Sequence, residues 1–521
     1  MELKVSSNYR VMFCVLFAIL TGGLLRAVIM EAPVRTGDGH EYELVVHAMA
    51  RHGSPAVTLE DVTDLRTRIV ARPVSSGWTP QILDRIAETM RHQGREEGGL
   101  FHAGEGQYYG WHFWLYAAFV SPVHAMLDAF DRNIFRSMQI ANAVVIIFVL
   151  GWLWFFMPAN RHICFWTGTL YLLGGSLFYL RWTHPEVFVT GLVTLGMAAL
   201  YSSAWRTALL AFGLASMQMV SLAPLMLLVP ARLLWAIDGS FRERLAVLRG
   251  YWRWLAAFVL PLIPPLFFYA YFGVYNLIAS AGVAQPIFVT WGRLWSFWAD
   301  LNQGAIVGLP WLVLLGIAAV LQAWYVPARR GTAEWFWAVL AAMIVCLPLL
   351  SQVNWNSGQA IFSRYALIAG APLVVWGGRY LASLHLPSIA ACFVVSVLAC
   401  FNAAYVGWHN SNNHIQHKPW VAWLWSHAPA YYNPEPEIFI ERTIGKEVGY
   451  ITPTVWQDDS GWIRKILLPA TGTGATLTDV CAGSRLVDEN GEIVKVSHLT
   501  ARQYGWGYLN GRFHCAPHTT Y

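Results

Sequence analysis

A short segment just after the first apolar stretch carries several side chains able to do acid–base chemistry. It reads GDGHEYELVVHAMARHG from Gly37 to Gly53 and brings Asp38, Glu41 and Tyr42 close together in the chain. A carboxylate can take a proton from a hydroxyl group, and a tyrosine can bind or orient a substrate. Asp38 is therefore a candidate general base, with Glu41 and Tyr42 as candidate pocket residues.

The same segment also fits a structural interpretation. Its apolar residues recur at helical spacing, which predicts an amphipathic helix that can lie along a membrane surface. In such a helix Asp38 is the N-cap and Glu41, three residues on, completes a capping box. The spacing fits both interpretations. His40 and His47 can share a helix face, and the simplest interpretation of both is exposed surface histidines.

Other candidate pocket residues lie in separate polar or aromatic segments. His112 belongs to the aromatic segment Gly110–Trp114, and His184 and Glu186 belong to the sequence RWTHPE between two apolar stretches. The second segment equally fits a turn that caps the next helix. Among the many tryptophans, most are typical of an aromatic belt at a membrane interface, and Trp355 is a candidate for lining a pocket.

Arg364 lies in Ser363-Arg364-Tyr365, at the start of a late apolar stretch. An arginine entering a membrane helix is costly unless it reaches the lipid headgroups or pairs with an anion. Its planar guanidinium can also bind a specific phosphate with two hydrogen bonds. Headgroup contact and phosphate binding both remain open, and Arg181 and Arg293 are weaker candidates of the same kind.

The composition indicates a membrane protein. Of the 521 residues, 56% are hydrophobic and 12% are charged, whereas soluble domains carry about 25% charged residues. An uncleaved first helix over Val11–Met30 is followed by further predicted spans. These lie at approximately 136–157, 163–180, 185–203, 254–273, 305–325, 333–350, 362–380 and 387–407, with 206–236 read as two short helices that meet at a break near Gln218 and Pro224.

The arginine distribution predicts the orientation. If Tyr109–Phe130 is an interfacial helix rather than a span, the arginine-rich loops fall on the N-terminal side of the membrane. The fold class is then mainly α, a polytopic bundle of about eleven transmembrane helices with a cytoplasmic N-terminus. Residues 1–408 form the membrane domain, and 31–130 form a first outer loop with interfacial helices, of which one begins at Pro80. Gly94–Gly106 is predicted to be a mobile loop.

Residues 409–521 are predicted to form a small mixed α/β or β-rich domain outside the cytoplasm. Alternating apolar residues at Ile463–Leu468 and Glu492–Val496 predict strands. Cys481 and Cys515 are the only cysteines in this polar part. In an oxidising compartment they are expected to form a disulfide.

The arrangement resembles the GT-C superfamily of membrane glycosyltransferases. The resemblance rests on the outer loop opening with Gly37-Asp38-Gly39 and Tyr42, on Gly110-Trp111-His112-Phe113-Trp114, and on Ser363-Arg364-Tyr365. It is similar to bacterial members that use polyprenyl-phosphate sugars, such as protein O-mannosyltransferases and aminoarabinose transferases. Two departures are clear: Asp38-Gly39 replaces the commoner Asp-Glu pair, and the aromatic segment lacks Pro-Pro.

What the resemblance implies is an inverting transfer of a monosaccharide from a polyprenyl-phosphate donor to an extracytoplasmic acceptor. The acceptor can be a protein such as pilin, a lipid or a glycan. Asp38 matches the catalytic base, and Arg364 and Glu186 match site positions less closely. No cofactor is identified, and a divalent metal is left open by the missing second acid. The expected location is the bacterial inner membrane, with the active site and C-terminal domain in the periplasm.

Two other functions are compatible with these patterns. One is a flippase or transporter of lipid-linked sugars, although the predicted spans contain few acidic residues and transporters usually place ionisable groups inside their spans. The other is a non-catalytic membrane assembly subunit. The expected partners are the lipid-linked sugar, the acceptor and membrane lipids, and no feature indicates nucleic acid.

Overall fold

The computed structural model describes most of the chain as helices, with two small antiparallel sheets. It divides into two compact units. The described residues are 7–35, 37–71, 80–236, 240–250, 252–325, 331–353, 355–356, 362–408, 415–446, 451–470, 480–482, 484–495, 499–501 and 505–517. The first unit comprises Met1–Pro286, Trp311–Val353 and Leu367–Ala404, and the second comprises Ile287–Pro310, Asn354–Ala366 and Tyr405–Tyr521. The second unit thus adds two segments from the predicted membrane domain to the C-terminal tail.

Three stretches of the described residues are helical, long and apolar enough to cross a membrane. The first is Phe13–Met30 in α1 (Ser7–Met30), and the second is Ile134–Phe156, which contains α6 (Ser137–Gly151). The third is Trp252–Phe272, formed by η5 (Trp252–Leu262) and α12 (Ile263–Phe272). The prediction of membrane helices is confirmed at this level, and the count of about eleven spans stays a prediction.

Several further helices of the first unit are apolar but shorter, and the bundle contains the predicted break. α9 ends at Gln218, and the 3-10 helix η4, which contains Pro224, joins it to α10. The further helices of this bundle are η2 (Trp152–Phe156), α7 (Arg161–Leu173), η3 (Ser176–Tyr179), α8 (Glu186–Tyr201), α9 (Trp205–Gln218), η4 (Val220–Leu227), α10 (Leu228–Ala236), α11 (Phe241–Gly250), α13 (Leu277–Ser280), α16 (Pro310–Tyr325), α17 (Gly331–Leu349), α18 (Arg364–Ser383) and α19 (Ser388–Trp408). The first residues of α18, up to Ala366, belong to the second unit.

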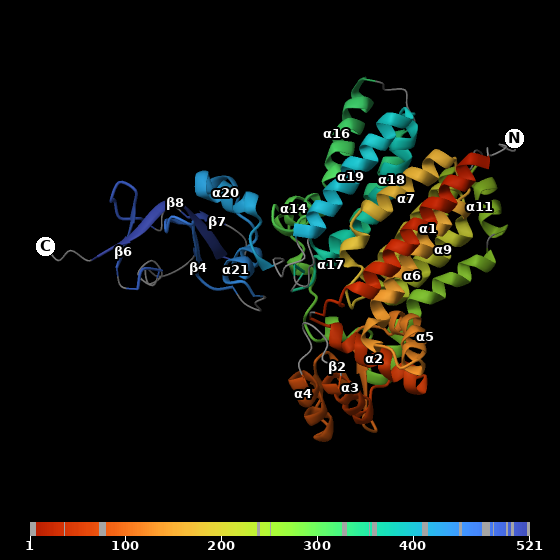
Figure 1. Cartoon of the computed structure of the whole chain (residues 1–521), viewed down its shortest axis with the longest axis horizontal. Helices are drawn as coiled ribbons and strands as arrows, with labels where there is room; N and C mark the ends of the chain where they lie inside the picture. The colour runs from red at the N-terminus through yellow and green to blue at the C-terminus, as the bar shows by residue number, and fades with distance from the viewer. Residues whose placement is uncertain are drawn as a thin grey trace. The chain divides into compact units, whose positions relative to one another are not determined.

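The first outer loop is a folded layer at one end of the first unit's bundle, and Figure 1 shows its helices gathered there. It contains α2 (Gly39–His52), α3 (Leu59–Ala71), α4 (Pro80–Arg91), β1 (Glu96–Glu97), β2 (Leu100–Gly104), β3 (Gln107–Gly110), α5 (Leu115–Ala129) and η1 (Ile134–Arg136). The strands form an antiparallel sheet in the order β1-β2-β3. The predicted mobile loop at Gly94–Gly106 is therefore wrong, because most of it belongs to this sheet.

The predicted helix after Asp38 is confirmed, but its surroundings differ from the expectation. Residues Glu41 to Ala48 of α2 are all buried, and the helix packs chiefly against α5. A buried ion pair between Arg35 and Glu43, with Nε and Oε2 2.9 Å apart, fixes α2 to the segment before it. The apolar face of α2 therefore contacts protein, and not a membrane surface.

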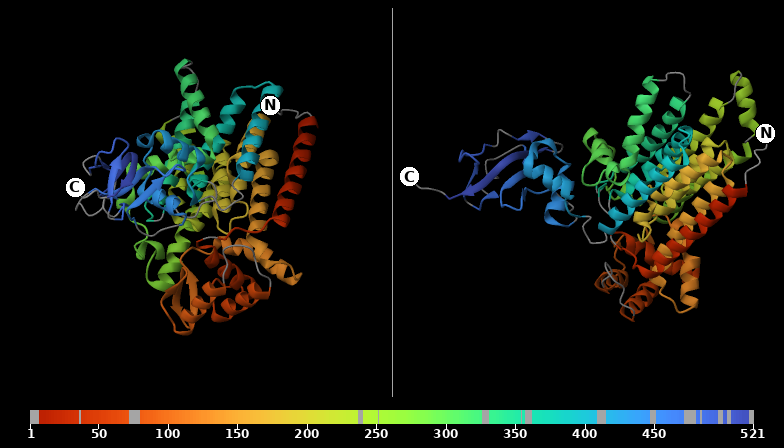
Figure 2. Two further views of the ribbon diagram at one scale, coloured as in Figure 1. Left: turned by 60° about the vertical axis from the view of Figure 1, so that its left-hand side comes forward. Right: turned by 45° about the horizontal axis from the view of Figure 1, so that its top comes forward.

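The two ends of the first bundle carry different chemistry. α1 runs from the end that holds α11 to the end that holds α2, α3 and α4, and the second view from another direction agrees (Figure 2). The first-loop end is where the acidic and histidine candidates of α2 lie. The opposite end carries arginines of α11 and of the start of η5.

The second unit combines short helices with an antiparallel sheet in the order β4-β5-β8-β6, with β7 paired to β8. The predicted strand at Ile463–Leu468 is confirmed as β5, whereas Glu492–Val496 forms only an isolated bridge at Ile493 within its described residues. The elements are η6 (Pro286–Phe288), α14 (Trp291–Ala299), α15 (Ala305–Gly308), α20 (Pro419–His427), η8 (Pro429–Tyr431), α21 (Pro436–Ile444), β4 (Thr454–Gln457), β5 (Ile463–Pro469), β6 (Arg485–Asp488), β7 (Thr500–Ala501) and β8 (Trp506–Ala516).

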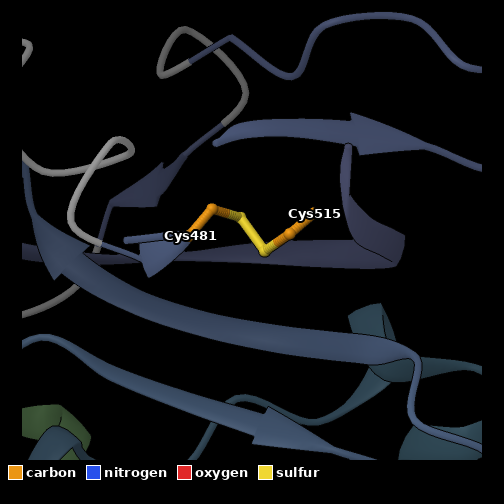
Figure 3. Close-up of a disulfide and its surroundings, with 2 residues drawn as sticks. All are labelled: Cys481 and Cys515. Carbon is orange, nitrogen blue, oxygen red and sulfur yellow. A yellow bond between two sulfur atoms is a disulfide. The ribbon is translucent and has the colours of Figure 1, made fainter. Parts of the chain in front are cut away.

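Cys481 and Cys515 form the disulfide expected from the sequence (Figure 3). Their Cα atoms lie 5.5 Å apart, and Cys515 pairs with Leu486 across β8 and β6. The buried Cys481 packs with Ile463, Leu486 and other apolar residues of the sheet. The bond therefore closes the chain around the sheet's own core.

Candidate functional site

The centre of the candidate site is a pair between a buried carboxylate of α2 and a histidine that follows β3. Glu41 Oε2 lies 2.8 Å from His112 Nδ1, and the backbone N–H of His112 donates to Glu41 Oε1 at 3.1 Å. Glu41 is only 1% exposed, whereas the His112 side chain is 23% exposed. A carboxylate that receives both bonds fixes the orientation of the imidazole ring.

Two glycines make room for the Glu41 carboxylate. Leu100 pairs with Gly110 across β2 and β3, and a Cβ atom at Gly110 would lie 2.2 Å from Glu41 Oε1. A Cβ atom at Gly99, whose φ of +77° also disfavours other residues, would lie 3.1 Å from Oε2. The glycine-rich composition that suggested a loop instead allows β2 and β3 to pack closely against the Glu41 carboxylate.

Burial raises the pKa of Glu41, while the neighbouring His112 opposes that shift. Asp38, one helical turn earlier, raises the pKa further because two negative charges repel each other. The two acids are thus electrostatically coupled.

Asp38 occupies the N-cap position of α2 but does not act as a side-chain cap. Its side chain makes no capping hydrogen bond to the helix, and the Glu41 carboxylate is directed to His112. The predicted capping box is therefore wrong. Asp38 is partly buried, which leaves its carboxylate between solvent and the packed start of α2.

An aromatic layer joins α2 to the segment RWTHPE. The Tyr42 ring stacks on His112 with centroids 5.0 Å apart and meets His184 edge-on at 5.6 Å. His184 is buried, and a Cβ atom at Gly39 would lie 2.4 Å from Thr183 Oγ1. Because Gly39 follows Asp38 directly, this close packing brings the start of α2 against Thr183 and His184.

The backbone holds this segment in place. Val34 and Trp182 form a parallel bridge, and Val34 N–H donates to Arg181 O at 2.8 Å. Arg181 Nη1 lies 2.8 Å from Glu31 Oε2, and its Nε donates to Ala32 O at 2.7 Å. Arg181 therefore ties the two segments together, and its charge already has a carboxylate partner. This disfavours a role in binding a donor phosphate.

Buried polar residues that were not predicted as site residues from the sequence lie next to the aromatic layer. Tyr116 Oη donates to Asn142 Oδ1 at 2.9 Å, and Asn142 Nδ2 donates to Trp182 O at 2.9 Å. Gln218 Oε1, at the end of α9, accepts from Tyr116 N–H at 2.7 Å. Glu186, the first residue of α8, is also buried. The available signal was the presence of Asn142 and Gln218 within otherwise apolar helices, because buried polar groups need partners.

Of the two α2 histidines predicted to be exposed, His47 is buried and His40 is partly buried. His40 lies 2.9 Å from Gly98 O, and His47 is 1% exposed. His47 Nδ1 lies 3.1 Å from His124 Nε2, and its Nε2 lies 2.9 Å from Asp64 Oδ2. The prediction of an exposed His47 is wrong, because α5 and α3 cover that face of α2.

The remaining candidates lie in the second unit. Arg293 is 2% exposed and pairs with Glu437 at 3.0 Å, and its guanidinium carbon lies 5.8 Å from the centre of the Trp355 ring. This ion pair disfavours Arg293 as a phosphate ligand. Arg364 is the first residue of α18, is 8% exposed, and donates to Tyr365 Oη at 3.1 Å. A helix start favours anions, so Arg364 is the stronger phosphate candidate.

Among the described residues, no group of three or more histidine, cysteine, aspartate and glutamate side chains is arranged to hold a metal ion. No family model, curated protein or solved structure matches the chain. The function must therefore be argued from the site itself.

Proposed function

We propose that this protein is an integral-membrane glycosyltransferase that uses a polyprenyl-phosphate sugar. The observation that supports this most directly is the position of Asp38. It stands at the start of α2 without capping that helix, beside the Glu41–His112 pair and the packed Tyr42–His184 layer. An acid, an oriented imidazole and aromatic rings are the groups that a sugar transfer needs for proton removal and for sugar contact.

In the proposed reaction an acceptor hydroxyl attacks the anomeric carbon of the donor sugar. A new bond forms between the acceptor oxygen and that carbon, while the bond from the carbon to the phosphate oxygen breaks. Asp38 takes the hydroxyl proton, the phosphate keeps the bonding electron pair, and the configuration at the carbon inverts. Positive groups that bind the leaving phosphate lower the barrier because negative charge develops there.

Glu41 and His112 support this step by their mutual geometry. With Nδ1 directed to Glu41, the His112 ring is fixed, and its other nitrogen can contact a sugar or a proton. The raised pKa of Glu41 keeps open a second assignment, in which the pair takes the proton in place of Asp38. Replacing Asp38 and His112 separately distinguishes the two assignments.

Arg364 is proposed to bind the donor phosphate, on evidence from its own unit alone. It combines a guanidinium, a position at the start of a helix and little exposure. A guanidinium binds phosphate through two parallel hydrogen bonds, which lysine cannot reproduce. Replacement by lysine therefore tests the role without removing the charge.

The proposed location is the bacterial inner membrane, in about eleven spans with the N-terminus in the cytoplasm. Three sufficiently apolar helices support membrane insertion. The end of the first unit that carries arginines of α11 and η5 is opposite the first-loop end (Figure 1). The excess of arginine favours the cytoplasm for that end, and thus the periplasm for the candidate site. The Cys481–Cys515 disulfide fits an oxidising compartment for the second unit.

The decisive experiment reconstitutes the purified chain in vesicles with a radiolabelled polyprenyl-phosphate sugar. Transfer of label to an added acceptor extract supports a glycosyltransferase. Movement of the lipid-linked sugar across the bilayer without transfer identifies a flippase or transporter, and neither activity favours an assembly subunit. Surface polymers from cells with and without the protein, compared by mass spectrometry, then identify the acceptor class.

A further inference from the structure

A basic cavity lies at the end of the first unit opposite the candidate site. It has a volume of about 590 Å³ and lies where α9, α11 and η5 meet. Arg206, Arg249 and Arg253 line it together with Trp252 and Trp254. This volume falls within the usual range of small-molecule sites, about 300–1,000 Å³.

All three arginines line the same cavity. Within the described part of the chain, none of them forms a salt bridge with a carboxylate. The guanidinium carbon of Arg206 lies 4.9 Å from the centre of the Trp254 ring, and that of Arg253 lies 5.6 Å from the centre of the Trp252 ring. Contacts with indole rings position the guanidinium groups but do not neutralise their charge. The cavity therefore favours an anion.

An apolar cleft of about 20 Å³, too small to enclose an acyl chain, adjoins the cavity and shares Arg206 and Trp254 with it. Its other lining residues include Leu209, Val229 and Leu255. Val259 of the same η5 stretch is 56% exposed, and this stretch is apolar enough to cross a membrane. A ligand with an anionic head and an apolar chain matches the two adjoining surfaces.

We infer that this site binds an anionic phospholipid, with its phosphate among the three arginines and an acyl chain along the adjoining exposed apolar surface of η5, which includes Leu255 and Val259. Guanidinium groups bind phosphate with well-directed paired hydrogen bonds, and basic pockets between membrane helices are suited to anionic headgroups. Tryptophans such as Trp252, which is 65% exposed, prefer the depth of the headgroups. The site is separate from Asp38 and its neighbours, so the inference does not depend on the proposed transfer reaction.

The test measures lipid binding to the delipidated full-length protein in neutral detergent by native mass spectrometry. The probes are dioleoyl-phosphatidylglycerol, dioleoyl-phosphatidylcholine and the soluble compound glycerol 3-phosphate. The key variant combines Arg206→Gln, Arg249→Gln and Arg253→Gln. The matched control is Arg242→Gln, which removes one exposed arginine of α11 outside the cavity.

The native protein is expected to bind phosphatidylglycerol more tightly than phosphatidylcholine and to bind glycerol 3-phosphate weakly. Each cavity arginine is expected to contribute about fivefold, so the triple variant loses about a hundredfold in phosphatidylglycerol affinity. Arg242→Gln should change it by less than twofold. If the triple variant does not fold, Arg249→Gln alone, at an exposed position, should lose about fivefold.

Three results would overturn the inference. Unchanged phosphatidylglycerol affinity in the cavity variants would exclude the site. An equal loss in Arg242→Gln would reduce the effect to overall charge. Equal affinity for glycerol 3-phosphate and phosphatidylglycerol would identify a site for free phosphate compounds, and not for a lipid.

Discussion

The Glu41 carboxylate accepts a hydrogen bond from the backbone N–H of His112 and lies 2.8 Å from the Nδ1 atom of the same residue. The two residues are separated by 71 positions in the sequence. One carboxylate therefore fixes both the backbone and the ring of the histidine. Because Tyr42 of α2 stacks on that ring, the helix and the aromatic segment are positioned together.

Glu41→Gln is expected to destabilise the first outer loop. Glutamine keeps the size of glutamate but removes the charge, and hydrogen bonds to a charged group contribute about 1.5–3 kcal/mol. Burial disfavours the charged form of Glu41 and raises its pKa, so the charge contributes less than it would otherwise. We therefore expect the variant to lose about 1–2 kcal/mol of stability. Hydrogen exchange of α2 amides measures it. Glu105→Gln, at an exposed turn, is the control, and equal protection in both variants would contradict the role of the pair.

Gly110→Ala is expected to disturb the same carboxylate without changing any charge. The added Cβ atom would lie 2.2 Å from Glu41 Oε1, so the carboxylate or the strand must move, at a cost of about 1–3 kcal/mol. Thermal unfolding in detergent measures the change. Gly22→Ala is the matched control, because a Cβ atom at Gly22 in α1 meets nothing within 4 Å. A Gly110→Ala protein as stable as Gly22→Ala would show that the close contact does not exist.

Acidification is expected to loosen the packing of α2 on α5 through His47 and His124. Burial lowers the pKa of His124 to about 3 and also lowers that of His47. Both histidines are neutral in the fold, whereas the unfolded chain gains protons below about pH 6.5. Stability is therefore full above pH 6.5 and falls as the pH decreases towards 3, by about 2 kcal/mol at pH 5 for His124 alone.

Several charged and polar groups surround these histidines, and the test must separate their effects. Asp64, Asp128 and Arg68 act on His124, and Ser137 lies near it. Hydrogen exchange of α2 and α5 at pH 7.5 and 5.0 measures the loss. His124→Asn should reduce the pH dependence, and His92→Gln, at an exposed position, should leave it unchanged. An undiminished pH dependence in His124→Asn would contradict the assignment.

The proposed topology predicts which positions react with a membrane-impermeant thiol reagent in intact cells. Single cysteines replace Arg242, Glu105 or Asp459 in a chain that lacks the free cysteines. Glu105→Cys and Asp459→Cys should react, because both lie in segments proposed to face the periplasm. Arg242→Cys should react only after the cells are opened, since the arginine excess favours a cytoplasmic position for α11 in the proposed topology. Labelling of Arg242→Cys from outside would reverse the orientation.

The sequence predicted individual elements better than their partners. α2 was predictable because helical spacing lies between two glycines, and its C-cap Gly53 has a φ of 73°. The break after Gln218 was predictable from Pro224, which cannot continue a regular helix. The sheet around Gly99 and Gly110 was not predicted, although Gly98 and Gly99 form the tight turn between β1 and β2 with positive φ. Gly110 instead follows from the space that the Glu41 carboxylate needs. Long-range contacts of this kind leave no local pattern.

In the candidate site, too, the residues were predictable from the sequence but their contacts were not. Tyr42, His112 and His184 were identified by residue type, and the structure brings them together. Sequence spacing instead paired Asp38 with Glu41 as a cap, because the local rule has no information on a partner 71 positions away. The ion pairs of Arg181 with Glu31 and of Arg293 with Glu437 also depend on tertiary structure, so the sequence alone did not predict them.

Asp38→Asn is the sharpest test of the proposed chemistry. Asparagine has the size of aspartate but cannot act as a base at neutral pH. As a general base, Asp38 should contribute about 10²–10⁴-fold to transfer, so the variant should lose that much of its rate in the vesicle assay. Its stability should be nearly unchanged, because the Asp38 side chain makes no capping hydrogen bond to α2 and asparagine is equally suited to an N-cap.

His112→Asn in the same assay separates the two proton acceptors. If Asp38 is the base, His112→Asn should reduce transfer through lost orientation, and its rate should keep the pH dependence of the native protein. If the Glu41–His112 pair is the base, His112→Asn should lose more of the transfer rate than Asp38→Asn. A correctly inserted Asp38→Asn protein that transfers sugar at the native rate would remove Asp38 from the mechanism, because asparagine cannot accept the hydroxyl proton at neutral pH.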